Sequence, residues 1–300
     1  MRRMAIFVVV LAVGVTALYF SQRRHDSTPV SANAVVEVVA DAQRDLSRVP
    51  MRLTRLSDDE EIAIGNQLAD QYSDVTAQLT PEELGLESYV RRVGNNVSLH
   101  AHRRLPYSFR LVPNRTMINA FSLPGGPVYV GEGLLDLMTS EDQLAAVLGH
   151  EVEHIDHYHC AERVQIEARL RKLRLDMVGV LVQIPLTVWE AGYNKDEELE
   201  ADREGIRLAV LSGYSPYGAV SMFERFRKLN NEYVIHAESP EEELSQLAIQ
   251  SLQGYFRTHP LPSERLAQAN RLIAQDGWQD RKALRPFRVE YEVKNGEVIN

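Results

Sequence analysis

Two histidines and a glutamate near the middle of the chain have the types and the spacing of a metal-dependent hydrolytic site. His150 and His154 are four residues apart, and Glu151 directly follows the first histidine. Residues four apart lie on the same face of an α-helix, so a helix here directs both imidazoles toward one ion, with the carboxylate beside it. In this H-E-x-x-H arrangement two imidazoles bind zinc and the carboxylate accepts a proton from the attacking water. The motif predicts one zinc ion per chain.

A short motif of this kind also arises by chance, so a third ligand must be found further along the chain. A metzincin needs a glycine three residues and a histidine six residues after the second histidine, but His157 and Cys160 occupy those positions. The gluzincin pattern takes a glutamate from a later helix, and Glu198 fits it. Asp202 follows one helical turn later, where it can accept the free N–H of a ligand imidazole. The alternative is that this acidic segment is only the solvated start of a helix.

The composition is that of a folded acidic protein. The 300 residues suffice for one large domain or two small ones, and the net charge of −9 argues against nucleic acid as the main partner. Cys160 is the only cysteine, which excludes an intrachain disulfide. On a continuous helix it lies on a different face from the two motif histidines, so we expect a small buried residue rather than a thiol ligand.

The elements that position these residues are predicted to be mainly α-helical with a small β element. The motif helix is expected over residues 140–160 with Ser140 as its N-cap, and the Glu198 helix over about residues 196–211. Ser57 precedes Glu60 by three residues and predicts a capping box, and Thr80 is expected to open another helix, with Pro81 at its first position. Ser263 is expected to cap a later helix. Strands are expected over residues 107–112 and 128–130, and a C-terminal hairpin around residues 295–296.

Several separated motifs together resemble one known family. In order along the chain they are the segment 119–126, the strand 128–130, Gly133-Leu134-Leu135, the motif 150–154, the segment 198–202, and residues 258–260 with Arg265. This set resembles the CAAX-prenyl-protease/HtpX-like family of zinc metallopeptidases, and its BepA-like periplasmic branch in particular. The resemblance covers roughly residues 57–273. Glu153 is a departure, because the family usually has a small residue before the second histidine.

The resemblance implies a gluzincin-type catalytic domain over residues 57–276, with unfolded or misassembled envelope proteins as substrates. It implies zinc ligands at His150, His154 and Glu198, and a catalytic base at Glu151. It further implies an edge strand that pairs with an extended peptide, a role that falls to Asn119, Val128, Tyr129 and Val130.

The family's His-Pro…Arg segment is matched by His259 and Arg265. The resemblance places both residues with the catalytic group, but their roles stay open at this stage. His259 could stabilise the oxyanion, could occupy the open zinc position and keep the enzyme latent, or could be only a turn residue. Arg265 is expected to anchor the loop that carries it.

The ends of the chain lie outside this expected domain. Residues 4–20 are apolar and are flanked by arginines on both sides, which favours an uncleaved signal-anchor over a cleaved signal peptide within residues 1–24. A linker and an N-terminal helix are expected over 25–56, and an extension over 277–300. The apolar segment 177–189 is expected to be a buried or lid-like helix rather than a second membrane span.

The sequence therefore predicts a zinc endopeptidase of the cell envelope that acts on polypeptides, tethered to the membrane or secreted. Its oligomeric state is not predicted. Two other functions remain open from the residues alone. One is a gluzincin aminopeptidase, and the other is a zinc-stabilised chaperone or scaffold without catalysis.

Overall fold

The computed structural model of the chain describes residues 56–70, 79–170, 193–232, 262–288, 292–294 and 297–299. The chain divides into two units, residues 1–54 and residues 55–300, and every described residue belongs to the second. The expected signal-anchor, the linker before residue 56, the apolar segment 177–189 and His259 all lie outside the described residues. Along the described stretches, no helix combines the length and the hydropathy that crossing a membrane requires.

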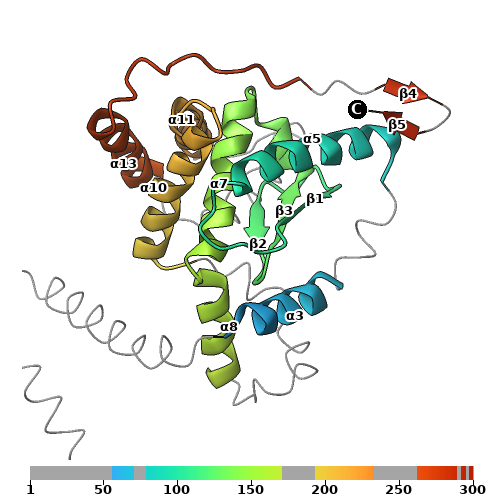
Figure 1. Cartoon of the computed structure of the whole chain (residues 1–300). Helices are drawn as coiled ribbons and strands as arrows, with labels where there is room; N and C mark the ends of the chain where they lie inside the picture. Colours follow the sequence, from blue (N-terminus) through green and yellow to red (C-terminus); the bar gives the residue numbers. More distant parts are fainter. Residues whose placement is uncertain are drawn as a thin grey trace, which may run out of the picture. The chain divides into compact units, whose positions relative to one another are not determined.

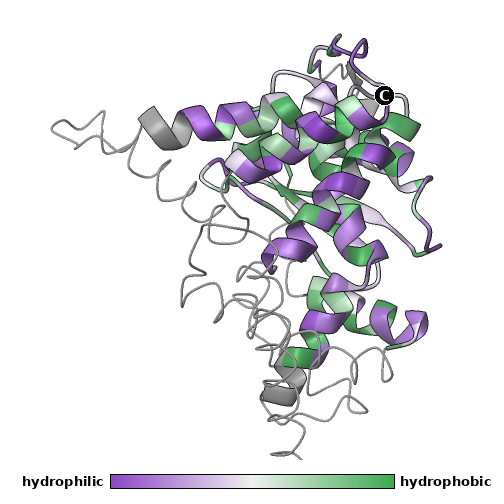
Figure 2. Cartoon of the chain, turned by 90° about the vertical axis from the view of Figure 1, so that its left-hand side faces the viewer, coloured by the Kyte–Doolittle hydropathy of each residue, from purple (hydrophilic) through white to green (hydrophobic). Residues whose placement is uncertain are grey.

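The described part is mainly helical with a small sheet, which confirms the predicted fold class (Figure 1). Most helices alternate hydrophobic and hydrophilic residues along their length, as expected for helices that bury one face (Figure 2). In chain order the elements are α3 (Asp58–Ala69), α5 (Pro81–Ser98), β1 (Ser108–Val112), β2 (Ala120–Ser122), β3 (Pro127–Gly131), α6 (Glu132–Asp136), α7 (Glu141–Asp156), α8 (His159–Leu170), α10 (Lys195–Leu211), α11 (Tyr217–Glu232), α13 (Pro262–Gln275), β4 (Glu292–Lys294) and β5 (Glu297–Ile299).

Helices α3 and α5 both begin at capping boxes, and the sequence predicts the first of them. The Ser57 hydroxyl accepts a hydrogen bond from the backbone N–H of Glu60, whose carboxylate accepts one from the backbone N–H of Ser57. Thr80 and Glu83 form the same pair at the start of α5. Each box satisfies backbone donors that the first helical turn leaves without intrahelical partners. Helix α13 differs from its prediction, because it begins at Pro262 and Ser263 is already helical.

The sheet has the strand order β1-β3-β2, which corrects one expectation. Strand β3 runs parallel to β1 on one side and antiparallel to β2 on the other. Val128, Tyr129 and Val130 therefore lie in the central strand, where they are buried, and not on an edge that could take up a peptide. Among the described strands, the edge strand next to α7 is β2, which contains Ala120 and Ser122. The two strands β4 and β5 pair antiparallel around residues 295–296, where the hairpin was predicted.

Helix α7 is the central element, and it is shorter than predicted. It packs against the sheet on one side and against α10 and α11 on another, and most of its residues are buried (Figure 1). It ends at Asp156, because Tyr158 has a left-handed backbone with φ of 64° and α8 begins at His159. Arg103 supports this turn by donating to the carbonyl of Ile155 at 2.7 Å and by stacking over the Tyr158 ring.

The crossing of α7 and α10 is unusually close, because two glycines meet there. A Cβ atom added to Gly149 would lie 2.5 Å from the carbonyl oxygen of Gly205, and one added to Gly205 would lie 2.6 Å from the backbone nitrogen of His150. Side chains at either position would push the helices apart. The two glycines therefore allow the acidic start of α10 to reach the histidines of α7.

Candidate metal and catalytic site

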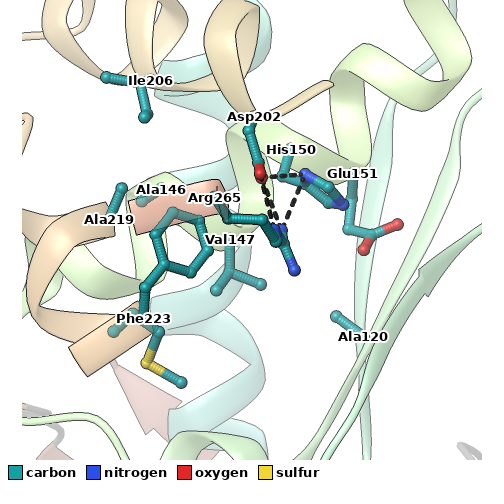
Figure 3. Close-up of a pocket in the computed structure, with 11 residues that line it drawn as sticks. Ala120, Ala146, Val147, His150, Glu151, Asp202, Ile206, Ala219, Phe223 and Arg265 are labelled. Atoms are coloured by element: carbon teal, nitrogen blue, oxygen red, sulfur yellow. Dashed lines mark hydrogen bonds and ion pairs between the residues drawn. The ribbon is translucent and has the colours of Figure 1, made fainter. Parts of the chain in front are cut away.

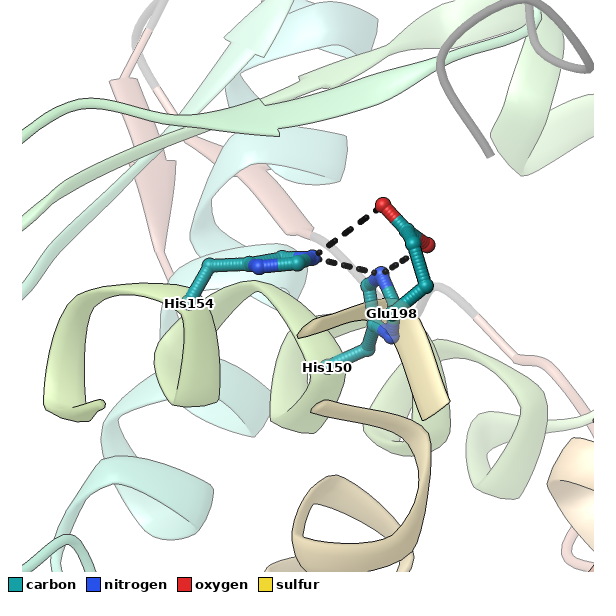
Figure 4. A group of neighbouring side chains, drawn as sticks. All are labelled: His150, His154 and Glu198. Atoms are coloured by element: carbon teal, nitrogen blue, oxygen red, sulfur yellow. Dashed lines mark hydrogen bonds and ion pairs between the residues drawn. The ribbon is translucent and has the colours of Figure 1, made fainter. Parts of the chain in front are cut away.

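Helices α7 and α10 bring together three side chains that can hold a metal ion. His150 and His154 lie on one face of α7, and Glu198 reaches them from the first turn of α10 (Figure 4). The Nε2 atoms of the two histidines are 3.0 Å apart. Glu198 places Oε2 3.5 Å from Nε2 of His150 and Oε1 3.7 Å from Nε2 of His154. All three side chains are buried.

The geometry of this group fits a zinc ion. Ligand atoms at about 2.0–2.2 Å from zinc and at tetrahedral angles are about 3.3–3.6 Å from one another. The three distances between the donor atoms lie close to that range. Two imidazoles and one carboxylate are also the donor set of a catalytic zinc site, which keeps its fourth position for water or substrate.

Asp202 and Arg265 hold the first of these imidazoles. Oδ1 of Asp202 lies 2.9 Å from Nδ1 of His150, and Arg265 donates to both oxygens of Asp202 at 2.6 Å (Figure 3). Burial alone would raise the pKa of Asp202, but the guanidinium of Arg265 and the His150 imidazole hold that pKa far below its usual range. The aspartate therefore stays ionised and keeps accepting from Nδ1, which turns Nε2 of His150 toward Glu198.

His154 has a different partner, which the sequence reasoning missed. Its Nδ1 lies 3.0 Å from Nδ1 of His159, and Nε2 of His159 lies 3.4 Å from Oε2 of Glu200. Tyr193 also stacks on the His154 ring, with 3.8 Å between the centroids. Helical spacing gives no signal for these contacts, because a residue five positions after His154 faces elsewhere on a continuous helix. The left-handed turn at Tyr158 creates the contact.

Glu151 lies beside the metal-binding group and is oriented from the sheet. The Ser122 hydroxyl, at the end of β2, donates to Oε2 of Glu151 at 2.9 Å. Sγ of Cys160 also contacts Ser122, at 3.6 Å from its hydroxyl oxygen, and lies 3.1 Å from the Tyr193 hydroxyl. Burial raises the pKa of the Cys160 thiol to about 12. As expected, this cysteine is a small buried residue, and it does not belong to the metal-binding group of the described part.

A pocket opens next to Glu151 and His150 (Figure 3). Arg265 and Asp202 supply polar groups to its lining, and Ala120 of β2 lies near Glu151. The remaining lining is apolar and comes from α7, α10 and α11, as Ala146, Val147, Ile206, Ala219, Met222 and Phe223. Among the residues predicted to contact substrate, Asn119 and the strand 128–130 do not line this pocket.

Comparison with known proteins identifies a matching family and several relatives. The model of peptidase family M48 matches residues 82–273, more than half of the chain. The chain is 31% identical over 262 residues to a beta-barrel assembly-enhancing protease of Yersinia pestis, which covers 80% of this chain and 50% of that protein.

Two further relatives match over shorter stretches. A beta-barrel assembly-enhancing protease of Escherichia coli K12 is 30% identical over 204 residues, which covers 61% of this chain and 38% of that protein. The mitochondrial metalloendopeptidase OMA1 of Arabidopsis thaliana is 31% identical over 171 residues, 53% of this chain and 31% of that protein. The chain therefore spans half or less of the length of these relatives.

Proposed function

The chain belongs to peptidase family M48, and we propose that it is a zinc-dependent endopeptidase whose active site is built on α7 and α10. The observation that carries the proposal is the convergence of His150, His154 and Glu198 next to the carboxylate of Glu151. A structural zinc site has no need of an adjacent carboxylate or of an open pocket, whereas a hydrolytic site needs both.

In this proposal His150, His154 and Glu198 hold the zinc ion, one per chain. The ion would polarise the scissile carbonyl and would lower the pKa of a water molecule at the fourth position. The chain's own contribution is to fix the three ligands before the substrate arrives. Asp202 with Arg265 orients His150, while His159 with Glu200 orients His154, so each imidazole presents Nε2 toward the same point.

Glu151 acts as the general base in this account. Its carboxylate accepts a proton from the attacking water and later delivers that proton to the leaving amine. The hydrogen bond from Ser122 leaves Oε1 for this exchange, because the serine donates to Oε2. Arg265 serves as a positioning residue that acts through Asp202. The role of His259 stays a prediction, since it lies outside the described residues.

The substrates we propose are polypeptides in extended conformation. The outer side of β2, which no other described strand pairs with, replaces the strand 128–130 as the surface along which a peptide backbone would pair, because Ala120 and Ser122 lie beside Glu151. The lining next to Glu151 is mostly apolar, which favours a hydrophobic over a charged substrate residue at this position. Exposed hydrophobic side chains are typical of unfolded or misassembled proteins.

The names of the relatives support a role in the cell envelope. Two of them are beta-barrel assembly-enhancing proteases, and we propose a related quality-control function for this chain. The apolar segment 4–20 would deliver the domain to the envelope and tether it there. The chain's net charge of −9 gives no reason to propose nucleic acid as a partner.

A hydrolysis assay with an unfolded model protein tests this function. The purified full chain should cleave reduced, unfolded casein, should lose activity to a chelator, and should regain it with Zn²⁺. Blocking the substrate's amino terminus should leave cleavage intact, because an endopeptidase cleaves internal peptide bonds. An aminopeptidase would no longer cleave the blocked substrate. If Glu151→Gln folds, binds zinc and still hydrolyses peptides like wild type, the proposed mechanism is wrong. If wild type itself shows no hydrolysis, the chain is a non-catalytic zinc protein.

A further inference from the structure

Glu153 is the charged residue within the motif 150–154 that the proposed active site does not use. Its side chain is fully buried. Within the described part of the chain, neither of its carboxylate oxygens has a hydrogen-bond partner. A buried carboxylate without donors is strongly destabilising, so the interior must supply either a proton or a cation to it.

Two neighbours of Glu153 carry groups that bind metals. Asp156 and His157 lie three and four residues later, on the same face of the last turn of α7. One ligand atom from each of the three side chains lies within 4.8 Å of the others. Oε2 of Glu153 lies 2.6 Å from Nδ1 of His157, yet neither atom has a partner with hydrogen-bond geometry among the described residues. The imidazole therefore pairs with Oε2 alone, and Oε1 is left without a partner among the described residues.

The charges around this group favour a divalent cation over a protonated histidine. Glu153 and Asp156 are both buried, so a single imidazolium would leave one negative charge without compensation. Asp156 accepts hydrogen bonds from the backbone N–H groups of His102 and Arg103, at 2.9 and 2.7 Å, which fix its carboxylate in place. The His102 imidazole also lies 2.9 Å from Asp156, but its side chain is 79% exposed and its charge is screened by solvent.

More distant groups do not change this balance. Glu200 lies 4.0 Å from Nε2 of His157 and adds negative charge, as does Glu204. The nearby cation Arg203 is already paired with these two carboxylates. A divalent cation neutralises Glu153 and Asp156 together and can take the neutral imidazole as its third ligand.

We propose that Glu153, Asp156 and His157 form a second divalent-metal site, separate from the group that holds the catalytic zinc. Two carboxylates and one imidazole suit Zn²⁺ or Mn²⁺ better than Mg²⁺, which binds oxygen ligands. The ion joins the end of α7 to the loop at residues 102–103 and to the turn that carries His159 toward His154. It stabilises the domain and takes no part in peptide hydrolysis.

Zinc stoichiometry tests the second site, and the proteins must carry no affinity tag. The full chain and its variants are stripped with a chelator, dialysed against buffered Zn²⁺ with excess Mg²⁺, and analysed by elemental mass spectrometry. We expect two zinc ions in wild type, one in Glu153→Gln, one in Glu198→Ala and none in the double variant. One zinc in wild type with no loss in Glu153→Gln would overturn the proposal and leave Glu153 and His157 as an ion pair.

A second measurement covers the case in which Glu153→Gln does not fold. His157 is about a quarter exposed and ends the helix, so His157→Gln is a milder change. Added Zn²⁺ should raise the melting temperature of Glu198→Ala but not that of Glu198→Ala/His157→Gln. An equal rise in both variants means adventitious zinc, and no rise in either means no second site. Because Glu198→Ala removes the proposed catalytic zinc, these outcomes do not depend on whether the chain is a peptidase.

Discussion

Nδ1 of His154 lies 3.0 Å from Nδ1 of His159, and the left-handed turn at Tyr158 makes this approach possible. When Nε2 of His154 serves as a zinc ligand, the neutral ring carries its proton on Nδ1 and can donate it to Nδ1 of His159. His159 must then donate from its own Nε2, and Glu200 is the acceptor at 3.4 Å. The contacts through His159 and Glu200 thus fix the His154 imidazole, as Asp202 fixes the His150 imidazole.

We predict that Glu200→Ala weakens zinc binding by about 10- to 100-fold, because His159 loses the acceptor that sets its tautomer. Glu200→Gln keeps a carbonyl oxygen at that position and should retain most of the affinity. Competition with a chromophoric chelator measures the affinity, and Asp196→Ala, an exposed acidic position on the same helix, is the control. Equal zinc affinities for Glu200→Ala and wild type would show that the contact from Glu200 through His159 does not support His154 as a ligand.

The buried pair of Arg265 and Asp202 should make the free energy of unfolding depend on pH in a defined direction. Breaking a buried pair by removing one partner costs about 3–5 kcal/mol, so Arg265→Gln should lower the free energy of unfolding by about that amount at pH 7. In wild type the pKa of Asp202 is held below its unfolded value. Its contribution is therefore present above about pH 4 and is lost as the pH falls through the folded pKa.

The difference in urea unfolding between Arg265→Gln and wild type should consequently narrow below about pH 4. Arg265→Lys should recover only part of the loss, because a lysine cannot donate to both oxygens of Asp202 in the planar geometry of arginine. A difference that stays constant from pH 7 to pH 3.5 would show that the ionised Asp202 is not what Arg265 stabilises.

The crossing of α7 and α10 predicts that Gly205→Ala is harmful. Alanine normally favours a helix over glycine by about 1 kcal/mol. Here the added Cβ would lie 2.6 Å from the backbone nitrogen of His150, so we expect a net loss of about 1–3 kcal/mol and weaker zinc binding. Thermal melting with and without zinc measures both effects. A higher melting temperature with unchanged zinc binding would mean that the helices need no such close contact.

The Cys160 thiol is predicted to be inert in the folded protein. Burial raises its pKa to about 12, so the reactive thiolate is scarce at ordinary pH. A disulfide reagent at pH 8 should label the native chain far more slowly than the urea-unfolded chain. The labelling rate of the native chain should stay low up to about pH 10. Rapid native labelling at pH 8 would show that the thiol is accessible and ionised.

The local signals of the sequence predicted much of this architecture. The capping box at Ser57 depends only on residues three apart, so it can be predicted without knowledge of the fold. The same is true of the convergence of His150 and His154, which helical spacing alone produces. Placing Glu198 and Asp202 near them required the family pattern, because no local rule fixes how α10 crosses α7.

The parts that sequence reasoning missed depend on contacts between distant segments. The end of α7 was expected at Cys160, but Arg103, more than fifty residues earlier, stabilises a turn at Tyr158 instead. The prediction that residues 128–130 form an edge strand is wrong. The buried, mostly apolar run from residue 127 to residue 131 is typical of a central strand. Strand pairing decides this question, and pairing partners are not visible in a single strand.

Zinc content measured in parallel on wild type and Glu198→Ala tests the central claim most directly. Both proteins are dialysed against limiting free Zn²⁺ and analysed for metal per chain, with Asp196→Ala as the matched acidic control on α10. The account predicts that Glu198→Ala binds one zinc ion fewer than wild type, that Asp196→Ala loses none, and that only Glu198→Ala loses peptide hydrolysis. Equal zinc content in Glu198→Ala and wild type would contradict the assignment of His150, His154 and Glu198 as the catalytic metal site.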